Sequence, residues 1–273
     1  MGLTRRALDN VERGSGEPLV VIPGVQGRWE YSRGLVDALA QHYRVITFSL
    51  GDERASGPEP VHGMDVLASQ VDAALDHLGV TAAPVVGVSF GGLVALHYAA
   101  TRPARTRALV MFSAPGPRWH LRPRHAFYAR LPWLFGPLFV AEAPFRLAQE
   151  VKAAFPDTRS RLRYVRQQVW TSLSAPASLS RMAARGLLIG RYDRVADCAR
   201  VACPTLIVHG DEQIDHVTGS GGTADYQQLI AGATLATVPN TGHIGTVTKP
   251  AACAGLVHDF LHSTTGNRRE SAA

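Results

Sequence analysis

The sequence predicts an α/β fold in which a mostly parallel sheet is flanked by helices and carries a helical insertion. Short apolar runs alternate with helical stretches toward both ends of the chain, which is typical of a parallel sheet. Residues 117–200 contain no convincing strand and show amphipathic helical patterns punctuated by prolines. The 273 residues suffice for one large domain with a full hydrophobic core.

Six apolar runs have the composition of buried strands. They are rich in Val, Ile and Leu, as expected where a strand is covered on both faces. These runs span residues 19–22, 43–50, 84–88, 108–112, 205–208 and 234–238. Helical stretches are predicted over 61–78, 91–100 and 251–261.

Residues 117–200 also differ from the rest of the chain in composition. They hold 11 of the 20 aromatic residues, and 15 of the 28 Lys and Arg against five of the 22 Asp and Glu. We expect a helical lid here, over a core made of residues 1–116 and 201–273. The positive charge could attract an anionic substrate, an acidic membrane surface or nucleic acid, but a solvated helical face is the simpler interpretation.

Composition and motif content argue against several classes of protein. The sequence contains no run of 18 uncharged apolar residues that would predict a membrane span, and no nucleic-acid-binding motif. No apolar segment follows Arg5 and Arg6, so we expect no signal peptide and a cytoplasmic location. Cys198, Cys203 and Cys253 form no metal or redox motif. The remaining expectation is a small-molecule substrate, with no metal and no cofactor.

The most informative motif is Gly87-Val88-Ser89-Phe90-Gly91, which fits the pattern G-x-S-x-G. It follows a predicted strand and precedes a predicted helix, where such a motif forms a nucleophile elbow. The sharp turn strains the serine backbone and leaves no room for side chains two residues away on either side. A phosphate-binding loop is the alternative, but the Lys-Ser/Thr that such a loop requires is missing. Ser89 is therefore predicted to be a nucleophile.

A base for Ser89 must lie on a loop at the same edge of the sheet. His243 directly follows the sixth predicted strand and meets this requirement. His216 also lies on a predicted loop and is an alternative. The chain order of nucleophile, acid and histidine favours the later residue, His243.

The ordered set of G-x-S-x-G, an acidic loop after a strand, and Gly-His after a later strand resembles the α/β-hydrolase fold family. The resemblance covers nearly the whole chain and implies a carboxylate that orients His243. The position this carboxylate usually takes in the family is occupied by Gln213, which cannot carry the charge. The usual spacing to the histidine instead implies Asp215, within an Asp-His-Val segment that is similar to the family's pattern. Asp211 is the alternative, with a turn-forming role as its simpler interpretation.

The resemblance also implies an oxyanion hole made of two backbone N–H groups. Phe90 would supply one and Val25, in the loop after the first predicted strand, the other. Gln26 could add an amide donor or face solvent, and Trp29 could line the site or pack. For a hydrophobic acyl or alkyl group the sequence offers aromatic residues, among them Trp119, Phe127 and Trp133, which could equally form the core of the lid.

The resemblance thus implies a hydrolase that uses a Ser-His-Asp triad on an ester or related acyl substrate with a hydrophobic group. The same fold also occurs in acyltransferases, carbon–carbon hydrolases and cofactor-free lyases, and in non-catalytic proteins that bind small molecules. The sequence gives no indication of the oligomeric state.

Overall fold

The computed structural model describes residues 10–51, 63–218 and 222–270, with side chains as far as Thr264. Its centre is a seven-stranded sheet in the order β1-β3-β2-β4-β5-β6-β7. Only β1 runs antiparallel to its neighbour, and all other pairs are parallel. The mostly parallel α/β fold is therefore confirmed. The strands are Asn10–Arg13, Pro18–Ile22, Arg44–Phe48, Ala83–Val88, Thr106–Phe112, Thr205–His209 and Thr234–Thr237.

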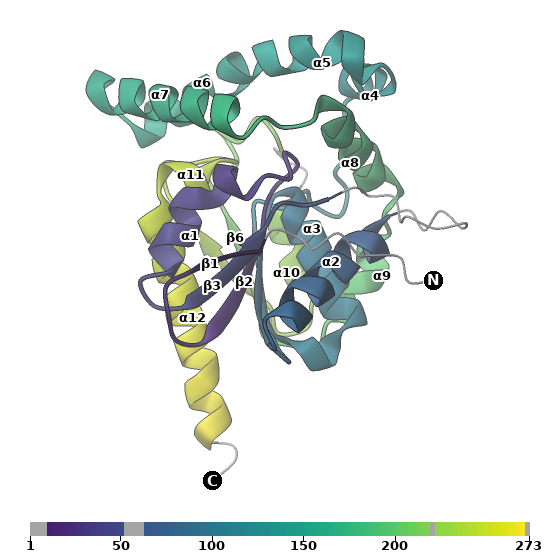
Figure 1. Ribbon diagram of the computed structural model, residues 1–273, viewed down its shortest axis with the longest axis vertical. Helices are drawn as coiled ribbons and strands as arrows, with labels where there is room; N and C mark the ends of the chain where they lie inside the picture. The colour runs from purple at the N-terminus through teal and green to yellow at the C-terminus, as the bar shows by residue number, and fades with distance from the viewer. Residues whose placement is uncertain (1–9, 52–62, 219–221, 271–273) are drawn as a thin grey trace.

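Helices cover both faces of the sheet and create two hydrophobic cores (Figure 1). Because side chains alternate along a strand, Val20 and Ile22 of β2 enter one core while Leu19 and Val21 enter the other. The first core is closed by α2, α3 and α9, which span Met64–His77, Phe90–Thr101 and Arg194–Cys198. The second is closed by α1 and α12, which span Arg33–Leu39 and Pro250–Glu270.

Short elements complete the layers. The strand β1 and the helix α1 are additions to the elements expected from the sequence, and β1 lies at the edge of the sheet. The other short segments are η1 (Trp29–Ser32), η2 (Pro103–Arg105), η4 (Thr223–Asp225), α10 (Tyr226–Leu229) and α11 (Gly245–Thr248).

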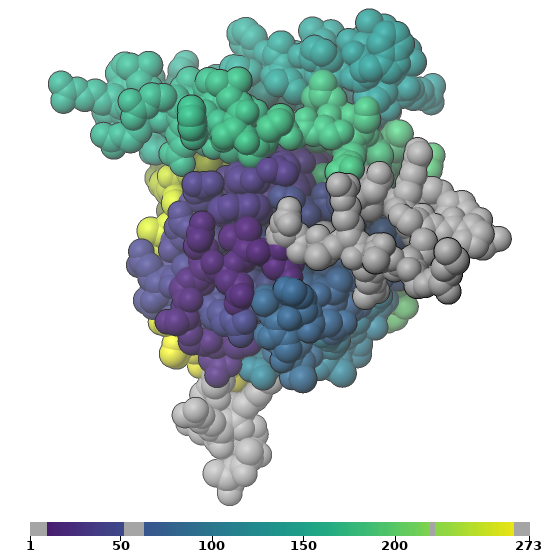
Figure 2. All heavy atoms as spheres, viewed as in Figure 1, coloured from purple at the N-terminus to yellow at the C-terminus, as the bar shows by residue number. Residues whose placement is uncertain are grey.

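Five helices lie between β5 and α9 and form a layer above one end of the sheet (Figures 1 and 2). The first three begin with a proline at one of their first two positions, where its missing N–H costs nothing. Asp157 and Ser178 cap the last two by accepting hydrogen bonds from the backbone of the first turn. The helices are α4 (Pro123–Arg130), α5 (Pro132–Ala141), α6 (Ala143–Ala154), α7 (Thr158–Ser174) and α8 (Leu179–Arg191).

The helix α9 belongs to the core layer, although it precedes residue 201. Its Asp197 is buried and accepts a hydrogen bond from His97 of α3, at 2.7 Å. Within the described part of the chain, no helix is both long enough and apolar enough to cross a membrane.

Candidate active site

Ser89 lies at the turn between β4 and α3, with an unusual backbone conformation of φ 54° and ψ −117°. A Cβ on Gly87 would lie 2.2 Å from the carbonyl oxygen of Gly91, and one on Gly91 would lie 2.4 Å from that of Ile22. Neither position therefore accepts even alanine without a shift of backbone. The close approach holds the turn in its strained shape, which projects the serine beyond the end of the strand.

His243 reaches the same point from the loop after β7. Its Nε2 atom lies 3.0 Å from Ser89 Oγ, within hydrogen-bond distance across 154 residues of sequence. His216 instead lies at the surface, where its Nε2 donates to Gln149 Oε1 at 2.7 Å. The structure thus brings His243, and not His216, to the serine.

Asp215 lies on the far side of the His243 ring and is only 8 % exposed. Its Oδ1 accepts hydrogen bonds of 2.8 Å from the backbone N–H groups of Val217 and Thr218, and its Oδ2 accepts one from the Thr218 hydroxyl. Its Oδ2 is also 3.7 Å from His243 Nδ1, which is ion-pair range but longer than a hydrogen bond. Burial alone would raise the pKa of Asp215, but His243 and the hydrogen bonds from Thr218 hold it well below its usual range.

Asp211 makes hydrogen bonds to the loop after β7 and none to His243 among the described residues. Its Oδ2 accepts a hydrogen bond of 2.8 Å from the backbone N–H of Asn240, and its own N–H donates to the carbonyl of Thr241 at 2.6 Å. These bonds tie the loop after β6 to the loop after β7. Asp211 therefore supports the two loops, whereas Asp215 faces the imidazole.

Glu150 on α6 is a residue that the sequence analysis missed. It is 1 % exposed, and its Oε1 accepts 2.7 Å hydrogen bonds from the N–H groups of Gly242 and Ile244, the two neighbours of His243. Its Oε2 is buried without a hydrogen-bond partner among the described residues. Burial raises the pKa of Glu150 to about 7, against the opposing effects of the two N–H groups and of His243. Nothing in the sequence near Glu150 signals this role, because its partners lie 92 and 94 residues away.

The pKa of His243 reflects the two carboxylates around it. Burial disfavours the charged imidazolium, but Asp215 and then Glu150 outweigh this effect and raise the pKa of His243 above its usual value. A histidine in this setting holds a proton more readily than an isolated buried one.

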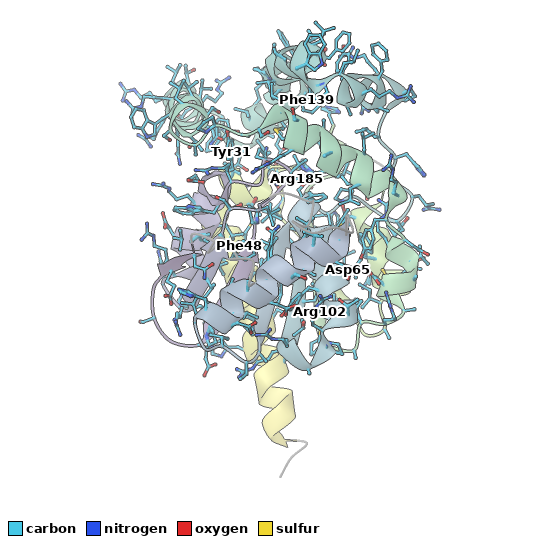
Figure 3. All side chains as sticks on the ribbon, turned by 45° about the vertical axis from the view of Figure 1, so that its right-hand side comes forward. Tyr31, Phe48, Asp65, Arg102, Phe139 and Arg185 are labelled. Atoms are coloured by element: carbon cyan, nitrogen blue, oxygen red, sulfur yellow. The ribbon has the colours of Figure 1, made fainter. Side chains whose placement is uncertain are left out.

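Arg185 on α8 supports the loop after β2 in a similar way. Its guanidinium donates to the carbonyl oxygens of Val25, Leu50 and Gly51, at 3.0, 3.2 and 3.0 Å. The side chain is 1 % exposed and lies where the five helices meet the sheet layer (Figure 3). Arg185 thereby holds the backbone around Val25, next to the Ser89 turn.

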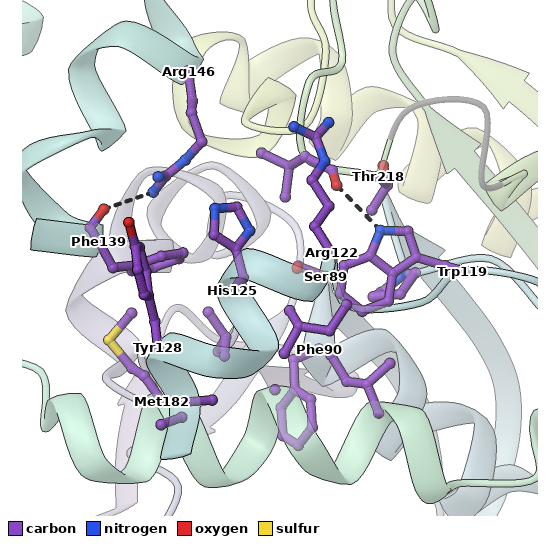
Figure 4. Close-up of a pocket in the computed structure, with 18 of the residues that line it drawn as sticks. Ser89, Phe90, Trp119, Arg122, His125, Tyr128, Phe139, Arg146, Met182 and Thr218 are labelled. Carbon is purple, nitrogen blue, oxygen red and sulfur yellow. Dashed lines mark hydrogen bonds between the residues drawn. The ribbon is translucent and has the colours of Figure 1, made fainter. Parts of the chain in front are cut away.

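Ser89 and His243 line a pocket together with residues of α4, α5, α6 and α8 (Figure 4). Val25 and Phe90, the two expected oxyanion donors, line it together with Trp119. The Trp119 indole N–H donates to the carbonyl of Val217 at 3.2 Å, which fixes its ring. Most of the remaining lining is apolar, including Leu121, Pro132, Phe139, Leu179, Met182, Ala183 and Ile189.

Four of the residues expected to contact substrate do not line this pocket. Phe127 and Trp133 are 50 % and 73 % exposed, because they occupy the faces of α4 and α5 that turn away from it. Trp29 is buried instead, with the guanidinium of Arg33 5.0 Å from its ring centre. Gln26 stands in the loop beside Val25 but is not part of the lining. Among the described residues, no three His, Cys, Asp or Glu side chains gather as a metal site would require.

Comparison with known proteins agrees with this architecture. The family model described as the alpha/beta hydrolase fold matches residues 17–250. The chain belongs to the α/β-hydrolase fold family. The match runs from β2 to the start of α12 and so includes Ser89, Asp215 and His243.

Two curated proteins each match 92 % of the chain. The 2-hydroxymuconate semialdehyde hydrolase of Pseudomonas sp. (strain CF600) is 29 % identical over 273 residues, which cover 88 % of that protein. The polyketide synthase ThaQ of Burkholderia thailandensis is 28 % identical over 257 residues. The chain spans only 12 % of the length of that synthase.

Solved structures share the fold at lower identity. The enol-lactonase from Burkholderia xenovorans LB400 superposes with a TM-score of 0.75 at 19 % identity, covering 93 % of this chain and 96 % of that one. The esterase EaEST from Exiguobacterium antarcticum gives 0.74 at 18 % identity, covering 93 % and 94 %. At these identities the likeness establishes the fold alone.

Proposed function

We propose that this protein is a serine hydrolase that cleaves an ester or a related acyl substrate through a covalent intermediate on Ser89. The observation that carries the proposal is the 3.0 Å approach of His243 Nε2 to Ser89 Oγ at the tip of a strained strand-to-helix turn. A nucleophile and a base within hydrogen-bond reach, with a third group behind the base, form the arrangement that activates a serine.

The reaction follows from these positions. Ser89 donates its proton to His243 Nε2 while Oγ attacks the substrate carbonyl and the carbonyl oxygen becomes an oxyanion. Backbone N–H groups of Val25 and Phe90 are the proposed donors to that oxyanion. His243 then returns the proton to the leaving group, whose bond to the carbonyl carbon breaks. Water repeats the sequence, releasing the acid and restoring Ser89.

Asp215 is the proposed third member of the triad. Its charge stabilises the imidazolium that forms during each attack, in keeping with the raised pKa of His243. The 3.7 Å separation between Oδ2 and Nδ1 has to shorten by less than an ångström to become a hydrogen bond. Catalytic hydrogen bonds are often long without substrate and tighten when it binds.

The helices α4–α8 are the proposed lid. They supply most of the apolar lining, so the acyl or alkyl part of the substrate would lie between them and Ser89. This assignment is narrower than residues 117–200, because α9 packs within the core layer. The likeness to the 2-hydroxymuconate semialdehyde hydrolase favours hydrolysis of a carbon–carbon bond next to a carbonyl as the second candidate reaction.

A fluorophosphonate probe tests whether Ser89 is a nucleophile independently of any substrate. We expect one probe per chain, attached to the peptide that contains Ser89, because only an activated serine reacts at a useful rate. Peptide mass spectrometry locates the adduct, and Ser113, another serine with positive φ, is the internal control. Absence of labelling, or labelling elsewhere, would contradict the proposed nucleophile and favour a protein that only binds small molecules.

A further inference from the structure

We propose that the pocket accepts an acyl substrate with a carboxylate at its far end, bound by Arg122, His125 and Arg146. This inference rests on the proposed function of the same site. The described residues that line the pocket include two arginines and three histidines but no Asp or Glu. Three of these five side chains, those of Arg122, His125 and Arg146, come from the segment between β5 and α8, and none has a role in the triad.

Carboxylates balance the positive charge of Arg122 and Arg146 only in part. Arg146 Nη1 is 3.3 Å from Glu142 Oε2, but the same oxygen also pairs with Arg124, so one carboxylate serves two guanidinium groups. Arg122 donates to the carbonyl of His216 at 3.2 Å, and it forms no ion pair within the described part of the chain. An anion entering the pocket would therefore meet donors that still lack a full counter-charge.

The groups lie close enough to influence one another. In the view of Figure 4, the His125 ring lies between the side chains of Arg146 and Arg122. Burial, and then the charges of Arg146, Arg124 and Arg122, lower the pKa of His125. Burial also lowers the pKa of Arg146, against the effect of Glu142. A bound anion would relieve this repulsion, and the neutral imidazole retains an N–H that can donate to it.

The surroundings favour a singly charged group. Tyr128 and Phe139 flank His125, with the Phe139 ring centre 5.3 Å from that of the imidazole. Because desolvation of a charge is costly in an apolar pocket, a carboxylate fits better here than a doubly charged phosphate. The planar guanidinium fork also matches both oxygens of a carboxylate. The substrate class is then a half-ester of a dicarboxylic acid, or an equivalent acyl compound.

The test compares two matched series of p-nitrophenyl esters. One series carries a free terminal carboxylate on succinyl, adipoyl and suberoyl groups, and the other carries the methyl ester of the same carboxylate. At the best chain length we expect kcat/KM to be about tenfold higher for the charged ester, since charge-assisted hydrogen bonds contribute this much. In Arg146→Gln and Arg122→Gln the ratio of charged to neutral ester should fall about fivefold or more.

Arg130→Gln is the matched control, because this arginine lies on the same helix as His125 but outside the pocket lining. It should leave the ratio unchanged. A ratio at or below one in the wild type, or equal ratios in all four proteins, would overturn the carboxylate site. Failure of the proposed function would look different, because neither series would then be hydrolysed.

A second inference rests on Glu150 alone. We infer that Glu150 positions His243 and stabilises its protonated form from the insertion. The two backbone N–H groups that flank His243 both donate to one Glu150 oxygen, so the loop cannot move without breaking this pair. The ionisable groups that face Glu150 are His243, Asp215 and, from α7, Tyr164. Its negative charge adds to that of Asp215 behind the imidazole.

The variant Glu150→Gln separates the charge from the hydrogen bonds. Its amide oxygen can still accept from Gly242 and Ile244, but the negative charge is lost. His243 must be neutral to act, so kcat/KM falls as the pH falls through its pKa. Removing a nearby negative charge lowers that pKa, and the acid limb should move to lower pH by about half a unit or more. At the alkaline plateau, kcat/KM should fall about tenfold, because the imidazolium that forms during the reaction is less stabilised.

Glu212→Gln is the control, since it removes an exposed carboxylate near the loop after β6. An acid limb that stays in place in Glu150→Gln would overturn the electrostatic role, whatever the loss of rate.

If Glu150→Gln does not fold, the pH dependence of kcat/KM in the wild type tests the inference instead. The charges of Glu150 and His243 interact directly, so protonation of either one disfavours protonation of the other, and the acid limb should be broader than a one-proton curve. A limb of one-proton width would contradict the inference.

Discussion

Ser89→Ala is expected to lower kcat/KM for p-nitrophenyl esters by about 10⁴-fold or more. The substitution removes the nucleophile, while the oxyanion donors and the pocket remain and sustain only weak residual catalysis. Alanine has the same Cβ as serine, so the backbone at φ 54° is as strained in the variant as in the wild type. The variant should therefore fold like the wild type, with the same circular dichroism and melting temperature.

The measurement is hydrolysis of esters from acetate to dodecanoate by both proteins at equal concentration. We expect the wild-type rate to rise with the length of the acyl chain until the pocket is filled. The reason is that the pocket-lining residues contributed by the segment from Leu121 to Ile189 are mostly apolar. Equal rates in the two proteins would show that another group performs the reaction. A wild-type rate independent of chain length would contradict the proposed acyl-binding pocket.

Asp215→Asn is expected to lower kcat by about 10³- to 10⁴-fold, whereas Asp211→Asn should cost less than tenfold. The asparagine at 215 can still accept from Val217 and Thr218, but it has no charge to stabilise the His243 imidazolium. Asp211 instead holds the backbone of Asn240, so its loss acts on the stability of two loops. Losing the charge at that hydrogen bond should destabilise the fold by about 1–2 kcal/mol.

Parallel measurements of kcat and of chemical denaturation distinguish the two carboxylates. Asp215→Asn should affect mainly kcat, and Asp211→Asn mainly the free energy of unfolding. The reverse pattern would identify Asp211 as the partner of His243. A large loss in kcat for both would mean that the loop as a whole, and not one carboxylate, orients the base.

The parts of the site that could be predicted from the sequence are those with local signals. The turn around Ser89 needs glycines at fixed positions, and the strand and helix on either side are visible in the sequence. His243 follows from chain order and from its place after a strand. The edge strand β1 gave no such signal, because its four residues are half-buried or exposed and include Asn10, Glu12 and Arg13.

Contacts made by the helices α4–α8 could not be predicted, because they depend on which face of each helix points inward. Trp133 and Phe127 have the composition of pocket residues but lie on outward faces, whereas the charged residues Glu150 and Arg185 are almost fully buried. Apolar character alone therefore predicts the wrong location, buried or exposed, for all four side chains. A buried charge is accepted only where several partners satisfy it, and these partners lie more than 90 residues away in the sequence.

Glu150 and Arg185 also limit how far the helices α4–α8 can be exchanged between relatives. Together they satisfy two N–H groups of the His243 loop and three carbonyls around Val25 and Leu50. A chimaera that receives foreign helices without an equivalent carboxylate and guanidinium would leave these five backbone groups without partners, at about 1–3 kcal/mol for each one that stays buried. Substrate range is therefore better engineered by changing the pocket-facing side chains of α4, α5 and α8 than by grafting a new insertion.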